Sequence, residues 1–191
     1  MLQSALFRSL FPWLTASVLA TLFCILVYSA VQQDIRSGAN DPQIQMAEDA
    51  ARDIASGRAS SEIIGQYLNV DIGKSLAPFI SVYDEEMSPS DSSGMLDGTV
   101  ALPPVGVFEK AKRDGEVRLT WEPQPKLRFA TIVVYQPESS DGKPFYVLSG
   151  MSLREAEKRE SFLAIEVLIA WFASVILIFL GWIFSLYLRR P

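Results

Sequence analysis

The stretch SLFPWLTASVLATLFCILVYSAVQQ, residues Ser9–Gln33, holds 25 residues and no charged side chain. A second stretch, VLIAWFASVILIFLGWIFSLYL at Val167–Leu188, is uncharged over 22 residues. The hydrocarbon core of a bilayer is about 30 Å thick, and roughly 20 apolar helical residues cross it. Each stretch is long enough to do so. The sequence therefore predicts a two-pass membrane protein with one folded domain between its spans.

The two apolar stretches also divide the chain into segments. We place transmembrane helices at residues 10–32 and 167–188. The first apolar stretch is much longer than the 7–15 apolar residues of a signal peptide, so we expect an uncleaved anchor. The other segments are tails at 1–9 and 189–191, a domain at 34–152 and a juxtamembrane helix at 153–166.

Basic residues near the spans predict the orientation. Arg8 precedes the first span and Arg189-Arg190 follow the second, which favours cytoplasmic termini. Arg154, Lys158 and Arg159 oppose this from the other end of the second span, but the tails are very short. We predict a protein of the inner or plasma membrane with an extracytoplasmic domain and both termini in the cytoplasm.

The composition of the middle excludes several function classes. Residues 34–166 carry 14 basic and 22 acidic side chains, a net charge of −8. Such a domain repels nucleic acid and anionic lipid surfaces. The chain has no histidine, and Cys24, its one cysteine, lies in the first span. Because the usual ligands of zinc and haem and the usual catalytic base are missing, we expect a protein that is not an enzyme and has no metal or cofactor.

Local patterns in the middle predict an α+β domain. Aromatic and β-branched runs indicate an antiparallel sheet of three to five strands. In the strand expected at 128–135, apolar residues do not alternate with polar ones, so we expect other elements to cover both of its faces. Amphipathic runs indicate flanking helices. The expected strands are 78–83, 117–121, 128–135 and 144–150, and the expected helices are 43–56, 61–68 and 105–113. Residues 84–98 read as a loop, with a short strand near Met95, and Asp141-Gly142 is a hairpin signal.

The segment Ser152-Leu153-Arg154-Glu155 has the spacing of a capping box, in which Ser152 and Glu155 each bond the other's amide. No proline or glycine follows until Gly181. We therefore expect one helix from residue 153 through the membrane to residue 188, with Ser152, Glu155 and Glu157 at its start acting as a relay.

This order of elements resembles the extracytoplasmic PAS-like or Cache-like sensor domains of two-pass bacterial histidine kinases and chemoreceptors. The resemblance is carried by PFISVYDE at 78–85, by the strands at 129–135 and 145–149, and by the exit helix SLREAEKRE at 152–160. In such kinases a phosphoacceptor histidine and an ATPase domain follow the second span, whereas this chain stops at Pro191. The resemblance implies that any signal passes to another polypeptide, such as a kinase, a transporter or a second copy.

Two groups of residues are candidates for contacts. Four aromatic side chains and one arginine suggest a small-molecule cleft, with the arginine gripping a carboxylate; the alternative is that the aromatics are core. They are Tyr83, Trp121, Arg128, Tyr135 and Tyr146. Small residues on one face of each span suggest helix packing. They are Ala16, Ala20 and Cys24, and Ala170, Ser174, Gly181 and Ser185.

Two functions fit these patterns. The first is a sensor-like membrane protein that binds a small ligand or partner outside and relays through its spans. The second is an accessory or scaffolding subunit of a larger membrane complex. The acidic loop residues Asp84, Glu85, Glu86, Asp91 and Asp97 lack the spacing of a calcium loop, which favours a solvated loop over a cation site.

Overall fold

The computed structural model describes residues 2–38, 41–139 and 142–188, with side chains from residue 10 onward. Residues 36–157 form one compact unit, here called the domain. The segments before and after it form a second unit, here called the helix pair.

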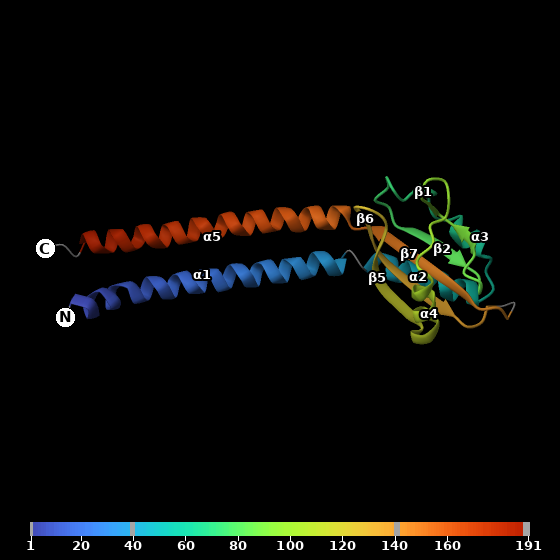
Figure 1. Ribbon diagram of the computed structural model, residues 1–191, viewed down its shortest axis with the longest axis horizontal. Coiled ribbons are helices and arrows are strands. Elements are labelled where there is room, and N and C mark those ends of the chain that lie inside the picture. The colour runs from blue at the N-terminus through green and yellow to red at the C-terminus, as the bar shows by residue number, and fades with distance from the viewer. Residues whose placement is uncertain (1, 39–40, 140–141, 189–191) are drawn as a thin grey trace. The chain divides into compact units, whose positions relative to one another are not determined.

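A five-stranded antiparallel sheet forms the centre of the domain, in the order β3-β2-β7-β6-β5 (Figure 1). The strands are β2 (Phe79–Tyr83), β3 (Pro89–Ser92), β5 (Glu116–Gln124), β6 (Leu127–Gln136) and β7 (Phe145–Ser152). The last strand in the chain, β7, thus lies in the middle, between β2 and β6. The predicted antiparallel sheet of three to five strands is confirmed.

Helices cover both faces of the sheet. The helix α2 (Asp41–Ala55) packs Ala47, Ala51 and Ile54 on one face, against apolar residues of β2, β6 and β7. The helix α4 (Val105–Asp114) packs Phe108 and Ala111 on the other. Alternate residues of β6 enter the two cores, so this strand is buried on both sides, as predicted.

The ring of Phe79 occupies space that two glycines leave open. Phe79 lies directly opposite Gly150 in the β2–β7 ladder. A Cβ added to Gly150 would lie 2.5 Å from the Phe79 ring, and one added to Gly94 would lie 2.7 Å from it. Real Cβ atoms essentially never come so close, so both positions need glycine for the ring to fit.

The segment predicted as a loop, 84–98, contains more structure than expected. The short strand predicted near Met95 is present as β4 (Gly94–Met95), which pairs in parallel with β1 (Val70–Asp71). The unexpected element is β3, the outer strand beside β2. The sequence did not predict β3 because this partly exposed edge strand consists of Pro, Ser and Asp, which are residues typical of loops. The helix predicted at 61–68 is shorter, α3 (Ser60–Ile64). The Asp141 of the hairpin signal lies outside the described residues.

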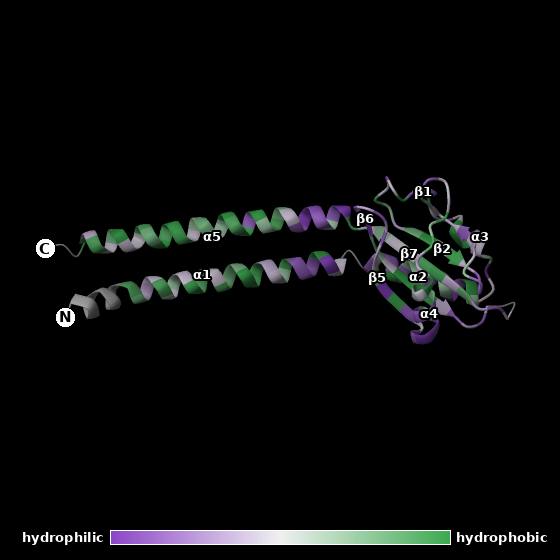
Figure 2. Ribbon diagram, in the orientation of Figure 1, coloured by the Kyte–Doolittle hydropathy of each residue, from purple (hydrophilic) through white to green (hydrophobic). Residues whose placement is uncertain are grey.

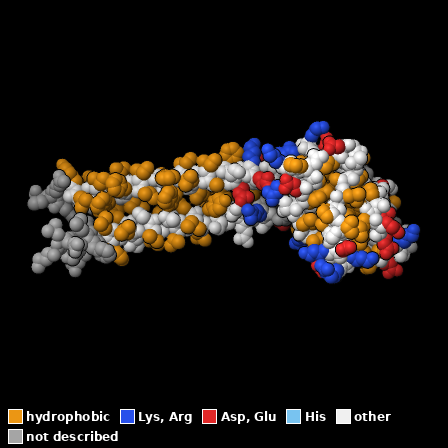
Figure 3. Space-filling view, in the orientation of Figure 1, with side chains coloured by type: hydrophobic (Ala, Val, Ile, Leu, Met, Phe, Trp, Pro, Cys, Tyr) orange, Lys and Arg blue, Asp and Glu red, His pale blue; other side chains and the backbone are white. Residues whose placement is uncertain are grey.

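The helix pair consists of α1 (Leu2–Gly38) and the part of α5 (Arg154–Leu188) beyond the domain. Both helices are long and apolar enough to cross a membrane. Figure 2 shows α5 changing from hydrophilic in its first turns to hydrophobic, and Figure 3 shows hydrophobic side chains over both helices.

Three specific contacts join α1 to α5. The indole of Trp171 donates a hydrogen bond of 2.9 Å to the Thr21 hydroxyl. The Gln32 amide bonds the Glu160 carboxylate. A Cβ on Gly181 would lie 3.0 Å from the ring of Trp13, so this glycine gives the ring room. The residue numbers in these pairs rise on one helix as they fall on the other, as expected for antiparallel helices.

The small residues predicted for packing lie mostly at this contact. Ala170 is exposed. The other six are half-buried, and they are Ala16, Ala20, Cys24, Ser174, Gly181 and Ser185.

Replacing Gly150 by alanine should destabilise the domain. The added methyl group collides with the Phe79 ring, and overpacking of this kind typically costs about 1–3 kcal/mol. Gly106→Ala is the matched control, because nothing lies within 4 Å of its Cβ position and alanine favours a helix. Urea unfolding of the full chain in detergent, followed by near-ultraviolet circular dichroism, measures both. Equal midpoints for the two variants would contradict the contact.

The helix pair predicts a specific cross-link. Cys24 and Val167 line the same groove between α1 and α5. A Val167→Cys variant in membranes should therefore react with a short bifunctional thiol reagent to join the two helices. After proteolysis of the domain, the two fragments should stay together on a non-reducing gel. Leu177→Cys, whose native side chain is 69% exposed, is the control and should give separate fragments.

Candidate functional site

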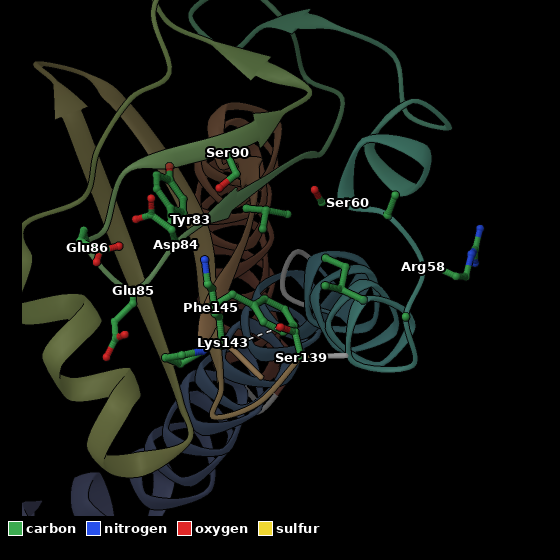
Figure 4. Close-up of a pocket in the computed structure, with 15 residues that line it drawn as sticks. Arg58, Ser60, Tyr83, Asp84, Glu85, Glu86, Ser90, Ser139, Lys143 and Phe145 are labelled. Atoms are coloured by element: carbon green, nitrogen blue, oxygen red, sulfur yellow. Dashed lines mark hydrogen bonds between the residues drawn. The ribbon is translucent and has the colours of Figure 1, made fainter. Parts of the chain in front are cut away.

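A cleft of about 610 Å³ lies at one end of the sheet (Figure 4). Its walls are the turn between α2 and α3, the end of β2 with the turn that follows, and the start of β7. Val82 and Phe145 contribute apolar surface from the sheet, and Ile54 contributes apolar surface from α2. The polar and charged lining residues are Arg58, Ser60, Asp84, Glu85, Glu86, Ser90, Ser139 and Lys143.

Several of these polar groups are already engaged. The Arg58 guanidinium pairs with Asp53 and Glu62, and it points away from the cleft in Figure 4. The Ser60 hydroxyl donates to Asp91.

The acidic side of the cleft is the turn after β2. An Asp84 oxygen accepts the amide of Ser88 at 2.7 Å, which closes this turn. Glu85 lies 3.7 Å from the Lys112 amine, a long and exposed ion pair. Among the residues that the structure describes, the side chains of Glu86 and Lys143 have no ion-pair partner.

Lys143 is the second cation of the cleft lining. It precedes β7, and its main-chain oxygen accepts a 2.8 Å bond from the Ser139 hydroxyl, which fixes the local chain. In Figure 4 its side chain extends toward the end of β2, where Asp84 lies. Within the described part of the chain, the cleft lining thus holds one cation without an ion-pair partner, Lys143, whose side chain extends toward the carboxylate of Asp84.

The four predicted aromatic site residues lie together in the core on the α4 face. The Phe108 ring contacts both Tyr83 and Tyr146 at centroid distances of 5.2 Å. Tyr135 packs on Tyr146 at 5.1 Å. Trp121 lies farther along the sheet against Phe129, at 6.1 Å. Of the four, Tyr83 alone lines the cleft.

Burial decides the chemistry of Tyr83. Its side chain is fully buried, and its hydroxyl donates a 2.9 Å bond to the main-chain oxygen of Ala101. Burial raises the pKa of Tyr83 from its usual 10.0 to about 12, because the phenolate would lose its hydration. Tyr83 is therefore a neutral hydrogen-bond donor whose side chain is fixed by the surrounding core.

The structure does not bring Arg128 to the aromatic residues. Side chains alternate along β6, so Arg128 and Phe129 point to opposite faces. Arg128 pairs instead with Glu157 in the first turns of α5, at 2.5 Å. Both side chains are nearly half exposed, so this pair adds at most about 1 kcal/mol to stability.

The predicted relay residues lie where β7 meets α5. Ser152 ends β7 opposite Phe129, and its hydroxyl accepts a long 3.4 Å bond from the Arg154 amide. The first helical bond runs from the Glu157 amide to the Leu153 oxygen at 2.8 Å. The helix thus begins one residue later than the capping box implies, because the ladder holds Ser152. Glu155 follows in the first turn of α5.

Other contacts hold the first turn of α5 to the domain. The Leu153 amide donates to the Arg128 main-chain oxygen at 2.9 Å. The Arg154 guanidinium donates to the Gly73 oxygen at 3.0 Å.

The acidic loop residues do not gather into a metal site. Asp97 bonds the amide of Gln124, away from the cleft residues Asp84 and Glu86. Within the described ranges, no three His, Cys, Asp or Glu side chains are placed to hold a metal ion together.

Sequence patterns did not reveal the cleft. Its lining comes from segments more than 80 residues apart, Arg58 and Lys143 among them. The available signals were the turn Gly57-Arg58-Ala59-Ser60 and a lysine just before a strand. Neither signal says which surfaces meet.

No family model and no curated protein matches the chain. Among solved structures, it is similar to the sensor domain of the zinc-responsive histidine kinase CzcS from Pseudomonas aeruginosa. The identity is 19%, the match covers 58% of this chain and 86% of that chain, and the TM-score is 0.29. The α+β class of the domain follows from its antiparallel sheet and flanking helices.

Tyr83 predicts a loss of stability at alkaline pH. The folded state holds the proton up to about pH 12, whereas the unfolded chain releases it near 10.0. The stabilisation is therefore complete below pH 10 and falls by about 2–3 kcal/mol as the pH rises to about 12. Unfolding free energies of wild type and Tyr83→Phe between pH 9 and about 12 test this. The variant should show the smaller loss, and parallel curves would refute the assignment.

Proposed function

We propose that this chain is a non-enzymatic, sensor-like protein that crosses the inner or plasma membrane twice. Its domain lies outside the cytoplasm, binds a small ligand or partner, and relays through the transmembrane helices to another membrane protein. Both termini lie in the cytoplasm. A kinase, a transporter or a second copy of this chain is the class of partner that fits.

The observation that carries the proposal is the course of β7. The strand begins at Phe145 in the cleft and ends at Ser152, two residues before α5 begins. Eight residues of strand cover about 26 Å. Because β7 is bonded on both sides, to β2 and β6, a displacement at its cleft end moves the centre of the sheet.

The helix α5 extends this connection. It is unbroken over 35 residues, or about 52 Å, and its first turn is tied to the domain through Arg128 and Gly73. A tilt or rotation of the sheet therefore turns the start of the helix with it. The length and apolar composition of the rest of α5 support its assignment as the second span.

The non-enzymatic part of the proposal is supported by the chemistry of the cleft. The chain has no histidine, and its one cysteine belongs to α1. The most buried ionisable group at the cleft, the Tyr83 phenol, is held neutral and bonded within the core. The remaining groups suit binding better than proton transfer.

A chimera tests the relay. The chain through Leu188 is joined to the cytoplasmic part of a two-pass sensor kinase, and kinase output is read from a reporter gene in cells. Ser90→Trp places a large ring in the cleft and mimics an occupant, so it should change the output. Lys110→Trp, on the exposed side of α4, is the control and should not.

Breaking α5 should then erase the effect of Ser90→Trp. Glu157→Pro removes the first helical bond and costs about 3 kcal/mol locally, while the domain still folds and the chain still inserts. Glu155→Pro, in the first turn where amides have no helical acceptor, is the control and should keep the effect. If Ser90→Trp never alters the output, the scaffolding function replaces the sensor.

A further inference from the structure

The charges of the cleft point to a class of ligand, and this step rests on the proposed sensor function. The lining carries two cations, Arg58 and Lys143. Arg58 already forms ion pairs with Asp53 and Glu62, which lie outside the cleft. The carboxylates are those of the turn after β2, Asp84, Glu85 and Glu86. The cleft therefore presents one available ammonium group against an acidic turn.

Neither a simple anion nor a simple cation suits this arrangement. An anion that pairs with Lys143 also faces Asp84, toward which the Lys143 side chain extends, and shares the cleft with the carboxylates of Glu85 and Glu86. A cation drawn to those carboxylates approaches the Lys143 amine. Opposite charges within about 4–6 Å stabilise each other and like charges do the reverse, so each single charge gains at one wall and loses at the other.

We propose that the cleft binds a small zwitterion with a short aliphatic frame. Its acidic group pairs with the Lys143 amine, and its ammonium group pairs with the acidic turn, where Glu86 is the uncommitted carboxylate. The aliphatic frame lies on the apolar surface of Ile54, Val82 and Phe145. The hydroxyl of Ser90, on β3 at the rim, is a further donor within the lining.

The volume agrees with a ligand of this size. A cleft of about 610 Å³ falls within the range of about 300–1,000 Å³ that is usual for small-molecule sites. Such a cleft leaves a molecule of fewer than ten heavy atoms partly open to water. The pairing of charges is then the main source of selectivity, and affinity is modest.

Matched ligands test the proposal directly on the full chain in detergent. The zwitterions are L-leucine and 5-aminopentanoate. 4-Methylpentanoate and 3-methylbutylamine each lack one charge of leucine, and pentanoate and pentylamine each lack one charge of 5-aminopentanoate. Ligand-observed NMR and calorimetric titration measure binding up to about 10 mM, which detects dissociation constants near 1 mM. At least one zwitterion should bind about tenfold more tightly than either of its singly charged analogues.

Three variants assign the charges. Lys143→Met and Glu86→Gln should each weaken the zwitterion about tenfold, because each removes one charged partner. Lys110→Met, on the exposed side of α4, should leave binding unchanged. Equal binding of an analogue, unchanged binding in Lys143→Met, or no binding by either zwitterion would overturn the proposal. The chimera readout with Ser90→Trp uses no added ligand, so the relay can stand even where the ligand class fails.

Discussion

The double burial of β6 and β7 is the constraint on which the rest of the domain depends. A strand covered on both faces needs a helix on each side and a bonded neighbour at each edge, because its main-chain groups have no water to bond. In this chain α2 and α4 supply the covers, and β2 and β5 complete the ladder. Placing β7 in the middle also fixes where α5 departs. The exit helix therefore starts from the most constrained strand of the sheet.

The same constraint separates core from cleft. Tyr83, Tyr135 and Tyr146 fill the α4 face and contact one another or Phe108, so their rings stabilise the sheet. The cleft forms instead where strands end and side chains no longer need covering on both faces. Its surface is accordingly mixed, with apolar side chains from the sheet and charged groups from the turns. Chemistry at such an end can vary without disturbing the core.

Sequence patterns predicted the elements that depend on local composition. The apolar runs, the helices α2 and α4, and the strands β2, β6 and β7 follow from periodicity and residue type. The patterns missed β3, because an exposed edge strand of Pro, Ser and Asp carries no strand signal. They also grouped Arg128 with aromatic residues from which strand alternation separates it. The cleft was not predicted because its walls, around Arg58, Asp84 and Lys143, come from three distant segments that only tertiary folding brings to one place.

The Phe79 ring, seated over Gly94 and Gly150, has a consequence for how the domain can move. If β2 slid along β7 by one or two residues, the ring would meet a side chain instead of a bare glycine. The pairing of β2 with β7 thus has a single permitted register. The domain therefore cannot change its shape by sliding β2 along β7. Any change of shape in this domain therefore has to keep the β2–β7 alignment intact up to Ser152, two residues before α5 begins.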